Sequence, residues 1–507
     1  MKKTTDKNKT DSNSRKAVLK RAISISVAAL IVFALTACSP AVKTTVSNVV
    51  DFTAVTDNVE TETLAVNSAD TAVTVSYGDF GITTDDGSVD VSGNTYTITA
   101  AGTYVVSGTL ENGQIVIDAG EEDDVELILN GMSITCSYDS PIYAKNAGKL
   151  KIKAESGTTN NVTDSRTVRK DENDVTGSAA IYALCDMNIV GYGSLTVNAG
   201  YNNGVQTKDD LKVKNVTLTV TAPNNAIKGN DSITIESGTV NAVSTAGDGL
   251  ETENYDISSK GNQRGIITIS GGTVNIRSAK DGIHAAYDVK ISGGTVTVTA
   301  GDDGIHAENT LQIDGGYVNV VNSHEGLEGH YVTVNDGEIH VYATDDGVNA
   351  TSSSGSRVSD GLITVNGGIM IVEVGGRDVD GIDANGSYKQ TGGIVIVSNP
   401  NADSSGNTAS VDSDGSVTVT GGIIVALGTV PGGAGGAGGV RGGRFGMGGM
   451  NAGSTLPSGY VTFSGSLSAG DHTFTYGDTS ISFTLKSKVS SGWIWASGIS
   501  TGSYTLK

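Results

Sequence analysis

The stretch "GDDGIHAE" (Gly301–Glu308) decides the fold, because a near-copy, "AKDGIHAA" (Ala279–Ala286), stands 22 residues earlier. Their spacing to related phrases is 21 to 23 residues, except for two steps of 33 and 34 residues that contain polar inserts. The chain is therefore expected to repeat one structural unit about every 22 residues. The related phrases are "NNGVQT" (202–207), "NNAIKG" (224–229), "GDGLET" (247–252), "HEGLEG" (324–329), "DDGVNA" (345–350) and "VDGIDA" (379–384), with incomplete copies "SPIYA" (140–144), "SAAIYA" (178–183) and "TASVDS" (408–413).

A second phrase, of the type "ISGGTVTV" (291–298), keeps the same register. Its copies lie at 267–276, 289–298, 311–320, 332–341, 363–372 and 417–426. Each is a short strand, a Gly-containing turn and another strand, so one repeat holds about three short strands and no helix. The period excludes a β-propeller, which needs about twice the length, and the Leu/Asn pattern of leucine-rich repeats is missing. We predict an all-β chain whose residues 76–430 form a parallel β-helix, a β-solenoid of about 22 residues per rung.

Each position in the phrase has a predicted direction, because alternate residues of a strand point to opposite faces. The branched aliphatic residue after the turn and the small residue two positions later are expected to point inward. The turn Gly fits a left-handed or tight backbone. The residue between the two inward positions should point outward and stack into a column: Gln206, Lys228, Glu251, His284, His306, Glu328, Asn349 and Asp383.

The residue before the turn Gly forms an acid column, which reads Asn203, Asn225, Asp248, Asp281, Asp303, Glu325, Asp346 and Asp380. Two unit charges about 4.8 Å apart repel by about 3.5 kcal/mol at an effective dielectric near 20, and by about 0.9 kcal/mol in bulk water. The stacked acids must therefore point into solvent or bind cations. Calcium takes carboxylate and carbonyl oxygens with flexible geometry. A solvated acidic edge is the alternative. The candidate calcium ligands are Asp248, Glu251, Asp281, Asp302, Asp303, Glu325, Glu328, Asp345, Asp346, Asp380 and Asp383.

The histidines raise a second metal question, because five of the six lie between His284 and His340. His284 and His306 stack in one column, flanked by Glu251 and Glu328, and two His with a carboxylate could bind zinc. The other three fall at different repeat positions. We therefore favour an exposed polar column.

Residues 1–37 form a separate segment, with eight Lys and Arg followed by the apolar run Ala22–Ala34. The run ends in "LTAC" (Leu35–Cys38), which resembles a bacterial lipoprotein signal. The resemblance implies removal of residues 1–37, lipidation of Cys38 and an extracellular location anchored to the cell membrane. An ordinary signal peptide or an uncleaved anchor is the alternative. Residues 38–75 are expected to be a tether.

The charge and the C-terminal region complete the domain assignment. From Cys38 onward the chain carries 25 basic and 53 acidic residues, a net −28, which excludes nucleic acid as a partner unless cations intervene. Residues 431–455 are a Gly-rich linker or loop, and 456–507 are a small β module or cap.

Trp493 and Trp495 could form a sugar-stacking platform, but a buried pair is favoured. Cys136 and Cys185 are expected to be buried free thiols.

Residues 80–430 resemble a family of secreted bacterial calcium-binding carbohydrate-binding proteins. The resemblance is carried by the "DDGIHA" and "ISGGTVTV" phrases and by the preceding "AGTYVVSGTL" and "VELILNGMSIT". It implies a right-handed parallel β-helix with a polysaccharide-lyase-like fold, bound calcium, and attachment to cellulose and pectic polysaccharide. Inserts at Asn254–Gly265 and Ser352–Asp360 depart from the pattern. By position, the family's acidic turns match Asp248, Asp281, Asp303, Glu325, Asp346 and Asp380.

Three functions are compatible with these observations. The leading one is non-catalytic, calcium-dependent polysaccharide binding at the cell surface. A calcium-dependent, pectate-type polysaccharide lyase is the first alternative, and a structural adhesin is the second. A lyase needs a base to take the C5 proton. The basic residues beside the acidic corner form no converging set, so no catalytic residue is assigned; they are Arg264, Arg277, Lys280 and Arg377.

Overall fold

The computed structural model describes residues 73–77, 79–85, 87–168, 176–352, 359–404, 408–430 and 456–507. The predicted signal segment, Cys38 and the Gly-rich 431–455 lie outside these residues, as does nearly all of the predicted tether. Every regular element in the described residues is a strand, from β1 (Val73–Tyr77) to β43 (Tyr504–Leu506). None of them is a helix long and apolar enough to span a membrane. The all-β prediction is confirmed.

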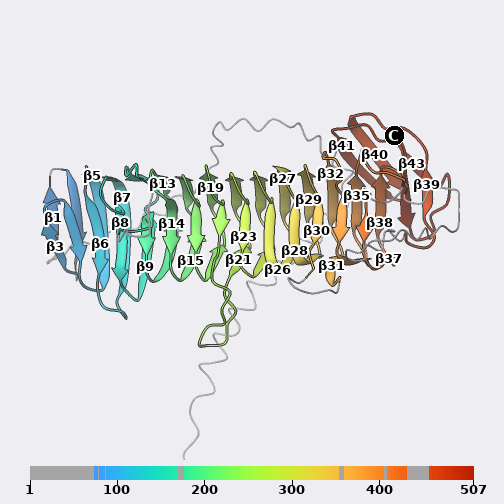
Figure 1. The fold of residues 1–507 in the computed structure, drawn as a ribbon. Coiled ribbons are helices and arrows are strands. Elements are labelled where there is room, and N and C mark those ends of the chain that lie inside the picture. Colours follow the sequence, from blue (N-terminus) through green and yellow to red (C-terminus); the bar gives the residue numbers. More distant parts are fainter. Residues whose placement is uncertain are drawn as a thin grey trace, which may run out of the picture. The chain divides into compact units, whose positions relative to one another are not determined.

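One hydrogen-bonded sheet contains 40 of the described strands, and most of its pairings are parallel. Each strand pairs with its counterpart in the next repeat, so the pairings separate into three ladders. The first ladder contains the "DGIHA" phrases, and its strands lie side by side in Figure 1. Its members are β6 (Gln114–Asp118), β8 (Ile142–Asn146), β11 (Ala179–Ala183), β14 (Asn203–Thr207), β17 (Ile227–Gly229), β20 (Leu250–Glu251), β23 (Ile283–Ala285), β26 (Ile305–Ile313), β28 (Leu327–Val334), β30 (Val348–Ala350), β33 (Ile382–Ala384) and β36 (Asp412–Ser413).

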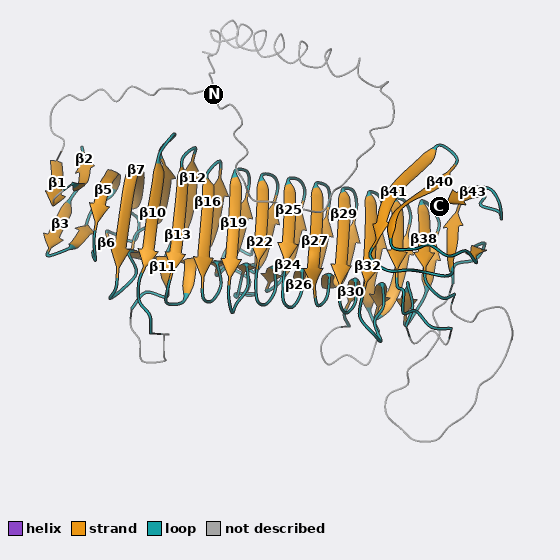
Figure 2. Cartoon of the chain, turned by 90° about the horizontal axis from the view of Figure 1, so that it is seen from above, coloured by secondary structure: helices purple, strands orange, loops and turns teal. Residues whose placement is uncertain are grey.

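The second and third ladders come from the two halves of the "ISGGTVTV" phrase. Figure 2 shows strands of the third ladder in one row. The second ladder contains β5 (Gly102–Leu110), β7 (Asp124–Cys136), β9 (Lys149–Ala154), β12 (Asp186–Gly191), β15 (Asp210–Lys214), β18 (Ser232–Ile235), β21 (Ile266–Ile269), β24 (Asp288–Ile291), the later parts of β26 and β28, β31 (Gly361–Val365), β34 (Gly386–Gln390) and β37 (Val417–Val419). The third continues from β7 through β10 (Thr159–Asp164), β13 (Ser194–Ala199), β16 (Thr217–Ala222), β19 (Thr239–Ser244), β22 (Thr273–Arg277), β25 (Thr295–Thr299), β27 (Tyr317–Ser323), β29 (Glu338–Ala343), β32 (Ile369–Val374), β35 (Ile394–Ser398) and β38 (Ile423–Leu427).

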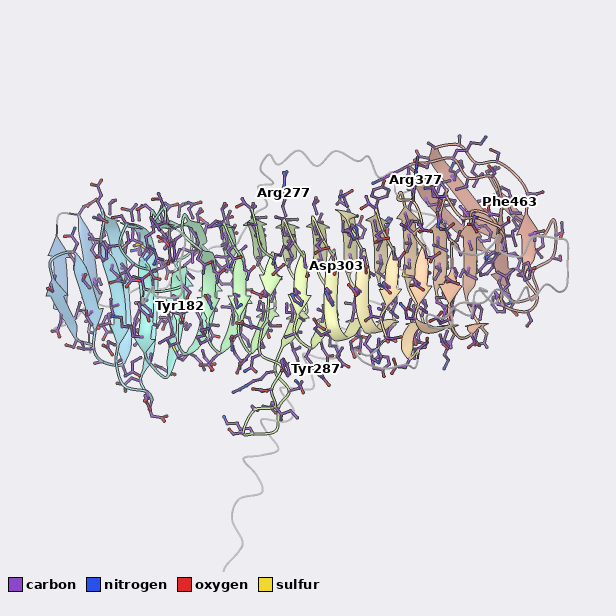
Figure 3. The ribbon with its side chains drawn as sticks, viewed as in Figure 1. Tyr182, Arg277, Tyr287, Asp303, Arg377 and Phe463 are labelled. Carbon is purple, nitrogen blue, oxygen red and sulfur yellow. The ribbon has the colours of Figure 1, made fainter. Side chains whose placement is uncertain are left out.

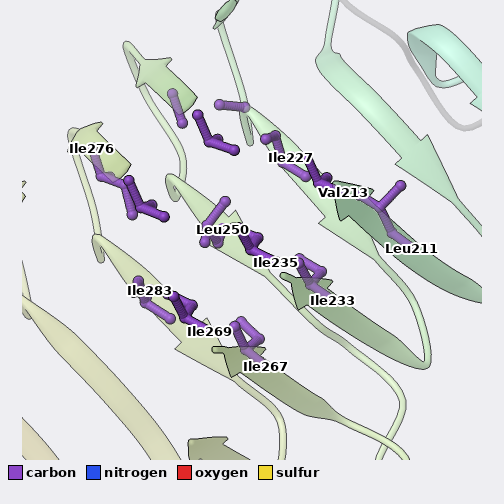
Figure 4. Packing of buried hydrophobic residues seen from close by; sticks show 14 of the residues in the cluster. Leu211, Val213, Ile227, Ile233, Ile235, Leu250, Ile267, Ile269, Ile276 and Ile283 are labelled. Carbon is purple, nitrogen blue, oxygen red and sulfur yellow. The ribbon is translucent and has the colours of Figure 1, made fainter. Parts of the chain in front are cut away.

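The core is built from the inward columns predicted from the repeat. All eight aliphatic residues that follow the turn have no exposed surface, and the small residues two positions later are buried. Figure 4 shows how Ile227, Leu250 and Ile283 of the first ladder pack beside the second-ladder pairs Ile233/Ile235 and Ile267/Ile269. Equivalent side chains therefore stack rung on rung, and one continuous apolar cluster runs along the ladders. Burial of these columns is the main stabilising contribution to the fold.

Two glycine columns have different physical reasons. The turn Gly of the "DGIHA" phrase does not have a positive φ, so the left-handed interpretation of it is wrong. A Cβ on Gly304 would lie 2.5 Å from the carbonyl oxygen of Gly326 and 2.6 Å from Val320, so close packing between rungs requires Gly there. The left-handed positions are in the "ISGGTVTV" turns, for example Gly294 (φ 86°) and Gly316 (φ 90°).

Antiparallel strands stand at both ends of the ladders. At the start, β2 (Phe80–Thr84) pairs with β1 and β5, and β3 (Val89–Ser92) pairs with β4 (Thr95–Ile98). At the other end, β42 (Gly492–Ala496) pairs antiparallel with β38 and with β39 (Val461–Phe463). A separate sheet of β40 (Gly470–Tyr476), β41 (Thr479–Leu485) and β43 packs into a second apolar cluster with this end. The C-terminal residues are thus joined to the last rung by hydrogen bonds.

The prediction of a buried tryptophan pair holds for Trp493 alone, and the prediction of buried free thiols holds for both cysteines. Trp493 is 2% exposed within this end of the chain, whereas Trp495 is half-buried and its Nε1–H donates to the carbonyl of Ser458 (2.9 Å). Both side chains lie on β42, the strand that pairs with β38. Because Trp493 is buried there, the two tryptophans do not form a joint platform for a sugar. Cys136 and Cys185 are both buried and free, and burial raises the pKa of the Cys185 thiol to about 11.

Candidate functional site

The outward column is longer than the sequence phrases indicated. The strand register places one residue of each first-ladder strand in a single line along the ladder. Tyr143 and Tyr182 extend the predicted column at one end, and Asp412 extends it at the other. The incomplete copies "SPIYA", "SAAIYA" and "TASVDS" were the sequence signal for this extension. In order, the outward column contains Tyr143, Tyr182, Gln206, Lys228, Glu251, His284, His306, Glu328, Asn349, Asp383 and Asp412.

The outward column is not the exposed column that we expected. Gln206 is 3% exposed and Lys228 is 8% exposed. The side chains of His284 and His306 are 28% and 20% exposed. The reason is that side chains of neighbouring rungs shield one another from solvent, and the adjacent acid column shields one flank of the outward column. The polar groups therefore line a largely desolvated surface, where charge interactions are stronger than in water.

The acid column stacks by hydrogen bonds that sequence reasoning did not anticipate. The backbone N–H of Asp281 donates to Oδ1 of Asp248 (3.1 Å), and that of Asp303 donates to Oδ1 of Asp281 (3.1 Å). Asp380 N–H donates to Asp346 Oδ1 (2.7 Å) in the same way. At the amide end of the column, Asn203 Oδ1 accepts from the N–H of Asn225 (3.1 Å). Carboxylates and amides thus fill the same structural role, which leaves Oδ2 of each acid for other partners.

In the middle of the column, the acids face the two histidines. The His284 and His306 rings are stacked, with centroids 5.0 Å apart. His306 Nδ1 lies 3.2 Å from Asp303 Oδ2, 3.8 Å from Glu328 Oε2 and 3.9 Å from Asp281 Oδ2. His284 Nδ1 lies 3.7 Å from the same Oδ2 of Asp281. Figure 3 marks Asp303 within this part of the ladder.

The charges of this middle section perturb one another. Burial opposes the protonated imidazole of His306, but the bond to Asp303 and the charge of Glu328 raise its pKa to about 9. Burial and the nearby carboxylate of Asp303 raise the pKa of Asp281 to about 6. Burial also raises the pKa of Glu328, to about 9. The raised pKa of His306 means that its positive charge offsets part of the repulsion among the neighbouring carboxylates.

The far end of the column is an all-oxygen cluster. One carboxylate oxygen from each of Asp380, Asp383 and Asp412 lies within 4.8 Å of the others. Burial, followed by repulsion from neighbouring acids, raises the pKa of Asp380 to about 8 and that of Asp383 to about 7. Asp346, one rung earlier, is raised to about 6, again mainly by burial. Partly buried carboxylates that lie close together offer the all-oxygen donor set that a calcium ion takes.

The remaining predicted ligands have other partners or more solvent. Glu251 accepts from Lys228 Nζ (3.0 Å) and from the side chain of Asn225, so an internal cation already balances it. Glu325 Oε2 accepts from the side-chain amide of Asn349 (2.9 Å). Asp302 is exposed, although one of its oxygens lies near Asp281 and Asp303. Asp345 lies 3.6 Å from the exposed His324, and Asp248 is buried within the acid column.

The start of the outward column is aromatic. The rings of Tyr143 and Tyr182 are 5.2 Å apart and tilted by 33°, and Lys145 Nζ lies 5.3 Å from the Tyr143 ring. Figure 3 marks Tyr182 along the same ladder as Asp303. Gln206 follows in the next rung. Stacked aromatic rings beside amide and charged groups are the chemistry that sugar rings and their hydroxyls recognise.

Among the basic residues considered for a lyase, the three arginines do not gather here, whereas Lys280 lies near the acid column, where its charge acts on Asp248. Arg277 and Arg377 lie along the upper rim, several rungs apart (Figure 3). Arg264 Nε donates to Asp231 Oδ2 (2.6 Å) and holds the base of the insert after β20. These positions leave the first-ladder surface without a shared arginine cluster among the described residues.

A family model and a curated relative that this chain resembles carry the same description. A family model described as "Carbohydrate-binding domain-containing protein" matches residues 92–303 and 300–431. A curated protein of Acetivibrio thermocellus with the same description is 42% identical over 135 residues, which are 26% of this chain and 47% of that protein. The chain thus matches about half the length of this relative. A solved gadolinium derivative of a polysaccharide lyase-like protein from C. thermocellum is 38% identical, covering 44% of this chain and 89% of that one, with a TM-score of 0.42. Since the family model covers more than half of the 507 residues, this protein belongs to the family of carbohydrate-binding domain-containing proteins.

Proposed function

We propose that this protein is a cell-surface lipoprotein that binds polysaccharide, without cleaving it, through a calcium-binding right-handed parallel β-helix. The observation that carries the proposal is its membership of a carbohydrate-binding family over residues 92–431. The three ladders, each pairing a strand with its counterpart about 22 residues on, support a coil with three faces. The face formed by the first ladder is the proposed binding face.

The polysaccharide lies along the outward column, because rung spacing nearly matches the repeat of a sugar chain. Tyr143, which is partly exposed and packs against the buried ring of Tyr182, stacks against a sugar ring at one end. A calcium ion at the acidic end bridges the protein to uronate carboxylates, which a chain of net −28 would otherwise repel. Pectic and other acidic glycans are therefore the preferred ligands, with cellulose as the neutral alternative.

Asp380, Asp383 and Asp412 are the residues that would hold this calcium. Their oxygens are close together on partly buried side chains, and Oδ1 of Asp380 is oriented by the backbone N–H of Ala409. Carbonyl oxygens of the adjoining turns and sugar carboxylates would complete the roughly six to eight ligands that calcium takes. Asp346, one rung earlier, adds negative charge.

Anchoring follows from the N-terminal signal. The proposed lipid on Cys38 would hold the binding face outside the cell, with residues 38–75 as the tether. Mass spectrometry of protein from the membrane fraction should find an acylated Cys38 at the N-terminus. Replacement C38S should release the protein from that fraction, and retention of the variant would remove the lipoprotein from the proposal.

Co-sedimentation with insoluble cellulose and with calcium-free pectin gel tests the binding. We expect binding to acidic glycan that chelator abolishes, and a large loss for Y143A compared with Y192A, whose exposed ring lies outside the outward column. If the protein binds neither glycan, the structural adhesin becomes the preferred function. If the protein releases unsaturated uronides in the presence of calcium, detected by their ultraviolet absorbance, it is a polysaccharide lyase and the non-catalytic function is wrong.

A further inference from the structure

The middle of the outward column differs from its acidic end in the atoms that it offers to a metal ion, because the middle contains two histidines. Imidazole nitrogen suits zinc, copper, nickel and iron, whereas calcium takes oxygen ligands. The acidic end offers only carboxylates, and the middle offers two imidazoles with carboxylates around them. One kind of ion therefore does not suit both places.

The geometry in the middle converges on a single point. Nδ1 of His284 and Nδ1 of His306 lie 3.7 Å and 3.9 Å from the same oxygen, Oδ2 of Asp281. One ligand atom from each of these three residues falls within 4.8 Å of the others. Ligands bound at about 2.0–2.1 Å to one tetrahedral ion lie roughly 3.3 Å apart. The two nitrogen-to-oxygen distances exceed this spacing by about 0.4 and 0.6 Å. The ligand atoms of the two histidines lie within 4.8 Å of each other, so rotation of the imidazole rings would bring all three ligands to one ion.

The supporting contacts fix the ligands from behind. Oδ1 of Asp281 accepts from the backbone N–H of Asp303 (3.1 Å), which leaves Oδ2 for the histidines. The stacked rings lie on paired strands, β23 and β26, so their separation is set by the ladder. Nε2 of His284 is buried and has no hydrogen-bond partner among the described residues, and Glu308 Oε1 is 3.7 Å away. A metal-bound imidazole usually donates its second N–H to a carboxylate, and a small shift of the exposed Glu308 would provide that partner.

We propose that Asp281, His284 and His306 bind a divalent transition-metal ion of the zinc class, at a site separate from the calcium site around Asp380. The carboxylate of Asp303, with Oδ2 3.2 Å from Nδ1 of His306, offsets the charge of the ion. Three protein ligands leave a fourth position open. That position faces the outward column, where a sugar hydroxyl, a uronate carboxylate or water would occupy it. The metal site does not depend on polysaccharide binding and is tested without it.

The test uses the full chain without an affinity tag, stripped of metal and titrated with Zn²⁺ by calorimetry in excess Ca²⁺. We expect one equivalent of Zn²⁺, and an affinity lower by more than about 100-fold in H284N and H306N. The matched control is H340N, because His340 lies on β29 in the third ladder and contacts Glu338 (2.8 Å). D380N should bind Zn²⁺ as the unchanged protein does.

A second measurement does not depend on the variants. Co²⁺ in the unchanged protein should give the intense visible bands of a four-coordinate site with nitrogen and oxygen ligands, and stoichiometric Zn²⁺ should remove them. Far-UV circular dichroism checks that each variant keeps its strands. Absence of stoichiometric Zn²⁺ binding, equal affinity in H306N, displacement of Zn²⁺ by equimolar Ca²⁺, or only six-coordinate Co²⁺ bands would each overturn the proposal.

Discussion

The partly buried carboxyl group of Asp380 predicts how the stability of the metal-free protein responds to pH. Burial and neighbouring acids raise its pKa from 3.8 to about 8 in the folded protein. Between these values the folded chain keeps a proton that the unfolded chain has released. The free energy of unfolding must therefore fall as pH rises through this window, and the stabilisation is fully present only below about pH 4.

The size of the effect follows from the proton difference. One extra proton in the folded state changes the free energy of unfolding by about 1.4 kcal/mol per pH unit. From about pH 5 to about pH 8 this gives about 4 kcal/mol for Asp380 alone. Asp346 and Asp383 titrate in the same cluster, with pKa values raised to about 6 and about 7. They share the same repulsion, so their contributions do not simply add.

The assay is urea unfolding in chelator at several pH values, followed by far-UV circular dichroism, which reports the strands of the ladders. D380N should flatten the pH dependence, whereas D90N, at an exposed position on β3, should leave it unchanged. Calcium at about 100 times its Kd should add about 2.7 kcal/mol at the alkaline end. Stability in chelator that is constant or rises from pH 5 to pH 8, or an unchanged slope in D380N, would refute the reasoning.

Four further substitutions test the scaffold, each by urea unfolding against the unchanged protein. G304A should destabilise by about 1–3 kcal/mol, because the added methyl meets backbone of the next rung at 2.5 Å; a neutral result would contradict the close-packing explanation. G316A should destabilise by about 1–3 kcal/mol through its positive φ, and G315A, without a positive φ, is the comparison. K228M should destabilise by about 3–5 kcal/mol because it leaves Glu251 buried without its cation, and the double variant K228M/E251L should recover most of this loss. E373Q weakens the acceptor of the Lys486 and Ser487 backbone N–H groups, so tryptophan fluorescence should change at lower urea than circular dichroism does.

The sequence predicted the parts of the fold that depend on alternation and period. The branched aliphatic residue after each turn must point inward wherever the strand alternates, so Ile283 and Ile305 could be assigned to the core from letters alone. The period of about 22 residues then gave the stacking partners, and the structure pairs His284 with His306 as expected.

The features that could not be predicted from the sequence depend on distances between rungs. A carboxylate accepting the next rung's N–H, as Asp281 does from Asp303, requires a backbone geometry that no single repeat contains. The burial of Gln206 and Lys228 arises from mutual covering by neighbours, which alternation does not report. The Lys228–Glu251 ion pair, in contrast, joins adjacent positions of one column and could have been read from the register.

The antiparallel pairing of β42 with β38 has a consequence for association between molecules. A stack of parallel strands ending in a bare strand would present unpaired N–H and C=O groups to the first strand of another copy. Repetition of that contact would polymerise the protein end to end into a fibre. β42 occupies the hydrogen bonds of the last rung in the opposite direction, from Ile423 to Leu427. The reversed strand thus ends the third ladder, so that the edge of this ladder does not continue into a second molecule.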